Sequence, residues 1–220
     1  MSGKRAIVFA NGELKHPEWA LEQIRASDLL VAADGGLNHL LKLGLIPQYL
    51  VGDLDSVTPQ QVDEMRAKGC KVEQFPVDKD QTDLELALLR AIVEEPEMVL
   101  VFGALGGRID QELANLSLLL MPELIDTNVR ILSESEQIFL IISAKEIQGE
   151  PGDRISLLPW GGPAVGVSTQ GLKYPLEFET LTPDRSRGVS NVMLEETAQV
   201  SVESGSLLCI FSPQGKHSEK

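Results

Sequence analysis

The sequence contains few of the residues that build disulfide frameworks and imidazole-based sites. Two cysteines, Cys70 and Cys209, lie far apart in a chain of 220 residues, which argues against a disulfide framework and against a thiolate zinc site. The three histidines show no metal-ligand spacing, and none of them lies in the motifs described below. Carboxylates, glycines and arginine are therefore the groups from which we expect the chemistry.

Basic residues and long apolar runs are also scarce. Nineteen Lys and Arg against 33 Asp and Glu give a net charge of −14, which argues against nucleic acid or an anionic membrane as a partner. The apolar run at 6–10 is too short for the core of a signal peptide, and no run approaches the roughly 20 residues of a membrane span. We expect a cytoplasmic protein whose negative field favours a cationic or metal-bound small molecule.

The first half of the chain alternates short apolar runs with helical patterns. Its 24% charged and 43% hydrophobic content is ordinary for a globular protein, and 220 residues suffice for one large domain or two small ones. The alternation predicts a mostly parallel, doubly wound sheet with helices on both faces, whose ligands bind beyond the carboxyl ends of the strands. The expected strands are 5–10, 28–33, 49–51, 70–75 and 98–102, and the expected helices include 17–26, 58–68 and 82–92.

From residue 128 the helical periodicity disappears. Short apolar runs separated by Gly, Pro, Ser and Asn predict an antiparallel, β-sandwich-like domain. We expect a first domain at 1–134, a second at 135–213 and a disordered tail at 214–220. The runs assigned to the antiparallel half are 129–132, 137–142, 154–158, 164–167, 198–202 and 206–211.

One acidic motif, LVGDLDS at residues 50–56, follows a predicted strand. On an extended backbone alternate side chains point the same way, so Asp53 and Asp55 should face one point beyond the end of the strand. Two converging carboxylates repel each other and favour a cation such as Mg²⁺. A solvated acidic turn is the alternative interpretation of an isolated pair.

Three further motifs occupy the same place in the alternation, where a parallel sheet brings them to one edge. Each has a simpler alternative: the glycines can only turn the chain, Thr82 and Asp83 can only cap a helix, and Arg108 can be a solvated surface residue. Together they favour phosphoryl transfer, because they supply carboxylates, a lysine, an arginine and backbone N–H groups. The motifs are Asp34-Gly35-Gly36, KDQTD at 79–83 and GGRID at 106–110.

These motifs resemble those of the thiamine pyrophosphokinase family. The matching stretches of the first half are ADGG at 33–36, GDLDS at 52–56, KDQTD at 79–83 and GALGGRID at 103–110, followed by Ala114-Asn115. In the second half, GLKYPL at 171–176 and GVSN at 188–191 are similar to the thiamine-binding domain of that family. The family often has histidine where this chain has Gln111 and frequently glutamate where it has Val192.

The resemblance implies ATP-dependent transfer of a pyrophosphoryl group to the hydroxyl of thiamine, giving thiamine diphosphate and AMP. Residues 1–134 would be the ATP-binding catalytic domain and 135–213 the thiamine-binding domain of a homodimer with shared active sites. Either Asp83 or Asp55 would accept the hydroxyl proton. The implied Mg²⁺ ligands are Asp53, Asp55 and Asp83, which with Arg108 form the catalytic set. The implied ATP site comprises Asp34, Gly35, Gly36, Lys79, Gln81, Thr82, Gly107, Arg108 and Asp110. The implied thiamine site comprises Tyr174, Ser190 and Asn191.

Two other functions are compatible with parts of the sequence. A haloacid-dehalogenase-like phosphohydrolase also places a DxD motif after a strand, but normally after the first strand, whereas two strand-helix units precede Asp53 here. A non-catalytic nucleotide or metal sensor would bind ATP without turnover. Release of AMP distinguishes the transferase from both.

Overall fold

The computed structural model describes residues 3–215, and the chain divides into two compact units, residues 1–134 and 135–220. Of the tail expected to be disordered, Gln214 and Gly215 are described, and the backbone N–H of Gln214 donates to Asp153 Oδ1 at 2.7 Å. The remainder of that prediction, 216–220, lies outside the described residues.

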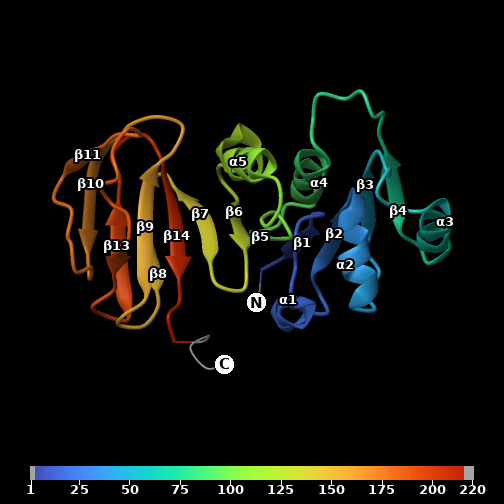
Figure 1. Cartoon of the computed structure of the whole chain (residues 1–220), viewed down its shortest axis with the longest axis horizontal. Coiled ribbons are helices and arrows are strands. Elements are labelled where there is room, and N and C mark those ends of the chain that lie inside the picture. Colours follow the sequence, from blue (N-terminus) through green and yellow to red (C-terminus); the bar gives the residue numbers. More distant parts are fainter. Residues whose placement is uncertain (1–2, 216–220) are drawn as a thin grey trace. The chain divides into compact units, whose positions relative to one another are not determined.

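The described part of the first unit is built on a parallel sheet of order β6-β5-β1-β2-β3-β4 (Figure 1). Its inner strands are short, continuous apolar runs, as expected for strands covered on both faces. The strands are β1 (Arg5–Phe9), β2 (Leu29–Ala33), β3 (Tyr49–Gly52), β4 (Lys71–Gln74), β5 (Met98–Phe102) and β6 (Asn128–Leu132).

Helices cover both faces of this sheet. One set of inward side chains, including Ile7, Phe9 and Leu50, shares a core with α1, α2 and α3, while α4 packs on β1, β2 and β3. The local sequence fixes where two helices begin: Thr58 and Gln61 form a capping box at α3, and Thr82 caps α4. The helices are α1 (Pro17–Gln23), α2 (Leu37–Lys42), α3 (Pro59–Ala67), α4 (Asp83–Ile92) and α5 (Ile109–Ser117), with 3₁₀ turns η1 (Asp34–Gly36), η2 (Leu118–Leu120) and η3 (Pro122–Leu124).

The assignment of run 129–132 to the antiparallel half is wrong. β6 pairs in parallel with β5, from Met98 opposite Asn128 to Phe102 opposite Leu132. The return from α5 passes through η2 and η3, whose short turns carry no helical periodicity that could be read as a crossover connection. The last strand of the parallel sheet was therefore grouped with the β-rich segment that follows it.

The second unit consists of two antiparallel sheets, of order β12-β9-β14-β7 and β11-β10-β13-β8. Buried side chains of both sheets, such as Phe139 and Leu157 from one and Ile147 and Val200 from the other, form one core, as in a sandwich. The predicted fold class is confirmed in both halves. The strands are β7 (Gln137–Ile141), β8 (Ala144–Gln148), β9 (Arg154–Pro159), β10 (Ala164–Gln170), β11 (Glu179–Leu181), β12 (Asn191–Val192), β13 (Thr197–Ser201) and β14 (Leu207–Ser212).

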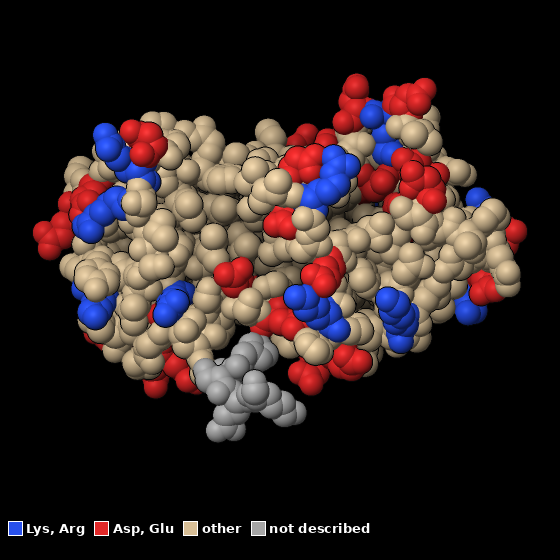
Figure 2. All heavy atoms as spheres, viewed as in Figure 1, with Lys and Arg blue, Asp and Glu red and all other residues tan. Residues whose placement is uncertain are grey.

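Charged side chains are interspersed on the face seen in Figure 2, where Lys and Arg lie singly or in small groups among Asp and Glu. The excess of acidic residues is therefore not gathered into one patch on that face. Among residues 3–215, none of the helices has the length and apolar character that a membrane span needs.

Candidate active site

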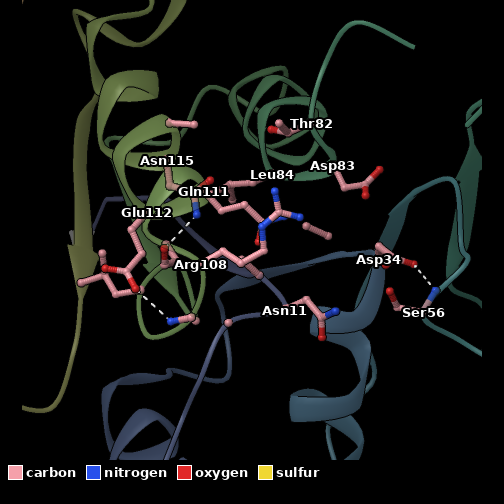
Figure 3. A pocket seen from close by; sticks show the side chains of 18 of the residues that line it. Asn11, Asp34, Ser56, Thr82, Asp83, Leu84, Arg108, Gln111, Glu112 and Asn115 are labelled. Atoms are coloured by element: carbon pink, nitrogen blue, oxygen red, sulfur yellow. Dashed lines mark hydrogen bonds between the residues drawn. The ribbon is translucent and has the colours of Figure 1, made fainter. Parts of the chain in front are cut away.

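A cavity of about 490 Å³ lies in the first unit, where the loops that follow β1, β2, β3 and β5 meet the start of α4 (Figure 3). All four sequence motifs contribute to its neighbourhood, as expected for the carboxyl edge of a parallel sheet. The predicted residues that line it are Asp34, Asp53, Asp55, Thr82, Asp83, Gly107, Arg108 and Asp110.

Three carboxylates gather beside this cavity. One oxygen from each of Asp34, Asp53 and Asp83 lies within 4.8 Å of the other two. Asp34 is buried, and the other two are partly buried. Convergent carboxylate oxygens are the donor set that Mg²⁺ prefers, so these residues fit a hard divalent cation.

The backbone explains why Asp34, and not Asp55, joins the other two. β3 ends at Gly52, and Leu54 has a φ of 67°, so Asp53 to Asp55 is not extended. The premise that alternate side chains point the same way is wrong at this turn. Asp55 lines the same cavity but is exposed, and its Oδ1 accepts from Ser56 Oγ at 3.0 Å.

Asp34 is directed to the cluster by an unusual backbone conformation. It begins η1 directly after β2 with a φ of 45°, a region that non-glycine residues rarely occupy. Its Oδ1 accepts from the backbone N–H of Ser56 at 3.3 Å, a bond drawn in Figure 3. Gly52 lies between the carboxylates: a Cβ there would come within 2.9 Å of Asp83 Oδ1 and 3.0 Å of Asp34 Cβ.

Lys79 supplies the internal cation of this cluster. Its Nζ lies 2.9 Å from Asp53 Oδ2 and 2.9 Å from Asp83 Oδ1, and only 9% of its side chain is exposed. One ammonium facing three carboxylates leaves an excess of negative charge, which a divalent cation can offset.

The titration of these groups follows from their contacts. The hydrogen bond from Lys79 lowers the pKa of Asp53, whereas burial beside other carboxylates raises the pKa of Asp83. Burial opposes the charge on Lys79, but hydrogen bonds to Asp83 and Asp53 outweigh it, so the pKa of Lys79 lies above its ordinary value. The two aspartates shift in opposite directions because the hydrogen bond from Lys79 dominates at Asp53, whereas burial dominates at Asp83.

The loop from β5 to α5 forms another wall of the cavity and carries Arg108. The Arg108 guanidinium donates through Nε to Asp110 Oδ1 at 3.1 Å and also contacts Asp110 Oδ2, and both side chains are largely exposed. The guanidinium lowers the pKa of Asp110. Arg108 is thus the cation of this loop, held by a carboxylate that a phosphate can replace.

The cavity lining does not include four of the predicted ATP-site residues: Gly35, Gly36, Lys79 and Gln81. Gly35 and Gly36 are buried, and a Cβ on them would come within 2.4 Å of the Asn11 side chain and 1.9 Å of Phe9 O, so close packing requires glycine at both. Gln81 is exposed and does not line the cavity. Thr82 both lines the cavity and caps α4, accepting from Glu85 N at 3.2 Å.

Several residues that line the cavity were not identified from the sequence. Asn11 and Gly12 follow β1, and the position of Asn-Gly directly after the first strand could have indicated them. Asn115, which belongs to a stretch that matches the family but was given no role in the site, donates to Ala104 O at 2.8 Å, and Glu112 accepts from the loop N–H groups (Figure 3). A glutamate five residues after a Gly-Gly pair was the available signal for Glu112.

In the second unit the structure brings two of the three predicted substrate residues together. Asn191 is buried: its Oδ1 accepts from Tyr174 N at 3.0 Å, and its Nδ2 donates to Tyr174 O at 2.7 Å. The Tyr174 side chain is 52% exposed. Ser190 is exposed, has a φ of 58° and donates through its N–H to Ser156 Oγ at 3.0 Å. Asn191 therefore fixes the backbone that presents the tyrosine ring.

A carboxylate cluster paired with a partly buried lysine, and an exposed arginine on the same cavity at the carboxyl edge of a parallel sheet, define a phosphoryl-transfer enzyme. Comparison with known proteins specifies the class further. Residues 21–132 match the family model described as thiamin pyrophosphokinase, catalytic domain, and residues 141–207 match thiamin pyrophosphokinase, vitamin B1 binding domain. The chain belongs to the thiamine pyrophosphokinase family, which confirms the resemblance found in the motifs.

Individual relatives cover nearly the whole chain. Thiamine pyrophosphokinase of Bacillus subtilis (strain 168) is 30% identical over 84% of this chain and 87% of its own length. Thiamine pyrophosphokinase 1 of Oryza sativa subsp. japonica is 28% identical over 92% and 85%. The crystal structure of the Bacillus subtilis enzyme superposes with a TM-score of 0.86 at 28% identity, covering 96% of this chain and 100% of that one.

Proposed function

We propose that Asp34, Asp53 and Asp83 hold the Mg²⁺ with which this enzyme works. As a member of its family, the chain is a thiamine diphosphokinase: it transfers a pyrophosphoryl group from ATP to the hydroxyl of thiamine and releases AMP. The observation that carries the proposed metal site is the convergence of the three carboxylates within 4.8 Å beside the cavity. When bound, the cation supplies charge neutralisation on the phosphoryl oxygens.

The chain's own residues provide the remaining electrostatics. Arg108 exchanges Asp110 for a phosphate oxygen, since an exposed ion pair in water is easily replaced. Lys79 is paired with Asp53 and Asp83, which line the cavity, so it would be available as a point charge for the transferred group if a divalent cation took its place on these carboxylates. Both cations then face the triphosphate rather than the protein's own carboxylates.

Asp55 is the residue we assign to the proton of the thiamine hydroxyl. It lines the cavity, lies outside the three-carboxylate cluster and accepts a hydrogen bond at its carboxylate from Ser56 Oγ. Attack of the hydroxyl oxygen on the β-phosphorus breaks the bond to AMP, and the hydroxyl proton passes to the Asp55 carboxylate. Asp83, the other candidate from the sequence, is occupied in the cluster.

Thiamine is assigned to the second unit, at Tyr174 and Ser190. The exposed Tyr174 ring provides a flat aromatic face for a cationic heterocycle, and Asn191 holds the backbone that carries it. Residues 135–213 are thus proposed as the thiamine-binding domain and 1–134 as the ATP-binding domain, in a cytoplasmic enzyme whose two buried cysteines suit a reducing compartment.

A homodimer with shared active sites is also part of this proposal. Helix α5 buries none of its residues within the chain, and its apolar residues Ile109 and Leu113 are 68% and 50% exposed. A second copy of the chain is the occupant that we assign to this apolar helix face, because the other side of the same helix, with Gln111 and Asn115, lines the cavity that both substrates must reach.

Product analysis tests the reaction, and mixed dimers test the sharing. Incubation with ATP, Mg²⁺ and thiamine should yield AMP and thiamine diphosphate in equal amounts, whereas a phosphohydrolase would release phosphate and a sensor would release nothing. An Asp53→Asn chain mixed with a Tyr174→Ala chain should regain part of the activity that each lacks alone. Verified mixed dimers without any regain would contradict shared sites.

A further inference from the structure

The loop between β5 and α5 is fixed along its carbonyl edge by the loop after β1. Gly103 O accepts from Gly12 N at 2.7 Å, and Glu13 N donates to both Leu105 O and Gly106 O at 3.1 Å. These bonds leave the N–H edge of the loop to be satisfied separately, because each peptide group carries both a donor and an acceptor.

A single carboxylate oxygen occupies that N–H edge. Glu112 Oε1 accepts from Gly106 N at 3.0 Å and from Gly107 N at 2.8 Å (Figure 3). The backbone N–H of Glu112 donates to Arg108 O at 3.0 Å, and the Arg108 side chain makes no capping bond of its own. Glu112 therefore holds the peptide units on both sides of Arg108.

We propose that Glu112 is a positioning residue for Arg108 in ATP binding. The inference rests on the proposed placement of the ATP phosphates beside Arg108. With Glu112 on both N–H groups, the loop backbone is not itself the phosphate-binding element. The Arg108 guanidinium is the phosphate-binding group, and it projects from a backbone position that Glu112 fixes. A Cβ at Gly107 would meet no atom within 4 Å, so this side of the loop is open to a ligand.

The effect of removing Glu112 follows from the exposure of its partners. Gly106 and Gly107 are both exposed, so water can replace the lost acceptor and the fold survives. The loop gains conformational freedom that ATP must then remove when it binds Arg108. The expected result of Glu112→Ala is a KM for ATP about fivefold higher, with kcat and the KM for thiamine changed less than about twofold.

Two further substitutions separate the position of the acceptor from its charge. Glu112→Gln keeps an oxygen at the same reach and should restore a KM for ATP within about twofold of wild type. Glu112→Asp keeps the charge but is one methylene shorter, so it should behave like Glu112→Ala. Glu123→Ala, which removes an exposed glutamate from the first turn of η3, is the matched control for loss of one acidic side chain.

Three outcomes would overturn the proposal. A lower or unchanged KM for ATP in Glu112→Ala would mean that the carboxylate competes with phosphate or has no role. A Glu112→Gln variant as impaired as Glu112→Ala would mean that charge, not acceptor position, matters. The double variant Arg108→Ala/Glu112→Ala gives the third test. If its increase in the KM for ATP equals the combined increases of the two single variants, Glu112 does not act through Arg108, since a residue acting through another adds nothing once that residue is gone.

Arg108→Ala alone distinguishes this inference from the assignment on which it rests. If that variant keeps the wild-type KM for ATP, the placement of ATP beside Arg108 is wrong, whatever Glu112 does. If Arg108→Ala raises the KM for ATP and Glu112→Ala does not, only the positioning role of Glu112 fails.

Discussion

Gly52→Ala should weaken the proposed metal site without removing any of its ligands. Gly52 has a φ of 147°, and an added Cβ would lie 2.9 Å from Asp83 Oδ1 and 3.0 Å from Asp34 Cβ. Ordinary contacts begin at 3.4 Å, so the Asp83 oxygen must retreat by 3.4 − 2.9, or about 0.5 Å. Mg²⁺ demands near-ideal octahedral geometry with Mg–O distances of about 2.0–2.1 Å, so the shift is a large fraction of one Mg–O bond length.

We expect the free Mg²⁺ concentration that gives half-maximal AMP release to rise about tenfold, equivalent to about 1.4 kcal/mol of binding free energy. The assay is AMP release at saturating ATP and thiamine with free Mg²⁺ titrated. Binding of Mn²⁺ to the nucleotide-free enzyme, followed by electron paramagnetic resonance, gives the same comparison without turnover.

Gly44→Ala is the matched control, because it suffers backbone strain alone. Gly44 has a φ of 71°, and its added Cβ would meet nothing within 4 Å. Both variants should lose about 1–2 kcal/mol of unfolding free energy from the strained backbone. Only Gly52→Ala should require more Mg²⁺. Equal metal dependence in the two variants would refute the assignment of the metal to the three carboxylates.

Three further predictions address the charged groups and the tyrosine loop. Asp34→Asn should raise the Mg²⁺ concentration needed for half-maximal activity. Asp55→Asn should leave that concentration unchanged but lower kcat about 10²-fold, because Asp55 is proposed to accept the hydroxyl proton. Mg²⁺ titrations of both variants make the comparison. Lys79→Met should lower the thermal unfolding temperature near neutral pH, because ionised carboxylates lose their internal cation. The difference should shrink as the pH falls and the carboxylates protonate, Asp83, whose pKa is raised, before Asp53, whose pKa is lowered. Calorimetry with and without Mg²⁺ measures this difference. Asn191→Ala leaves the Tyr174 N–H and C=O without partners, so the KM for thiamine should rise about tenfold while that for ATP stays constant in steady-state kinetics.

The sequence predicts the parallel sheet well because its inner strands are buried on both faces. A strand such as Met98 to Phe102 is a continuous apolar run that is easily recognised in the sequence, and capping residues such as Thr58 and Thr82 mark helix starts directly. Strand β8 (Ala144–Gln148) was missed for the opposite reason, since Ile147 is its single buried residue. Exposed strands resemble loops in composition.

The aspartates that line the cavity were predictable from the sequence, but their grouping was not. Order along the chain brought Asp34, Asp53, Asp55 and Asp83 to one sheet edge, and all four do line one cavity. Which three converge depends on the φ of Leu54, 67°, and on that of Asp34, 45°. Aspartate adopts a positive φ more often than most residues, but leucine seldom does, so the sequence does not indicate the turn at Leu54 that separates Asp55 from the cluster.

The basic residues of this site are paired with the protein's own carboxylates, and the exposure of these pairs differs between its two halves. Arg108 and Asp110 are exposed, so water screens their attraction and a phosphate can replace the carboxylate at little cost. Lys79 and Asp53 have side chains only 9% and 12% exposed, so separating them without a substitute would leave charges buried and unpaired. A divalent cation can replace Lys79 as the partner of the carboxylates, and a triphosphate can replace the carboxylates as the partner of Lys79. Because the metal alone would leave Lys79 unpaired and the nucleotide alone would leave the carboxylates unpaired, metal and nucleotide should favour each other's binding at this site. The net charge of −14 therefore opposes free ATP more than it opposes ATP that arrives with its cation.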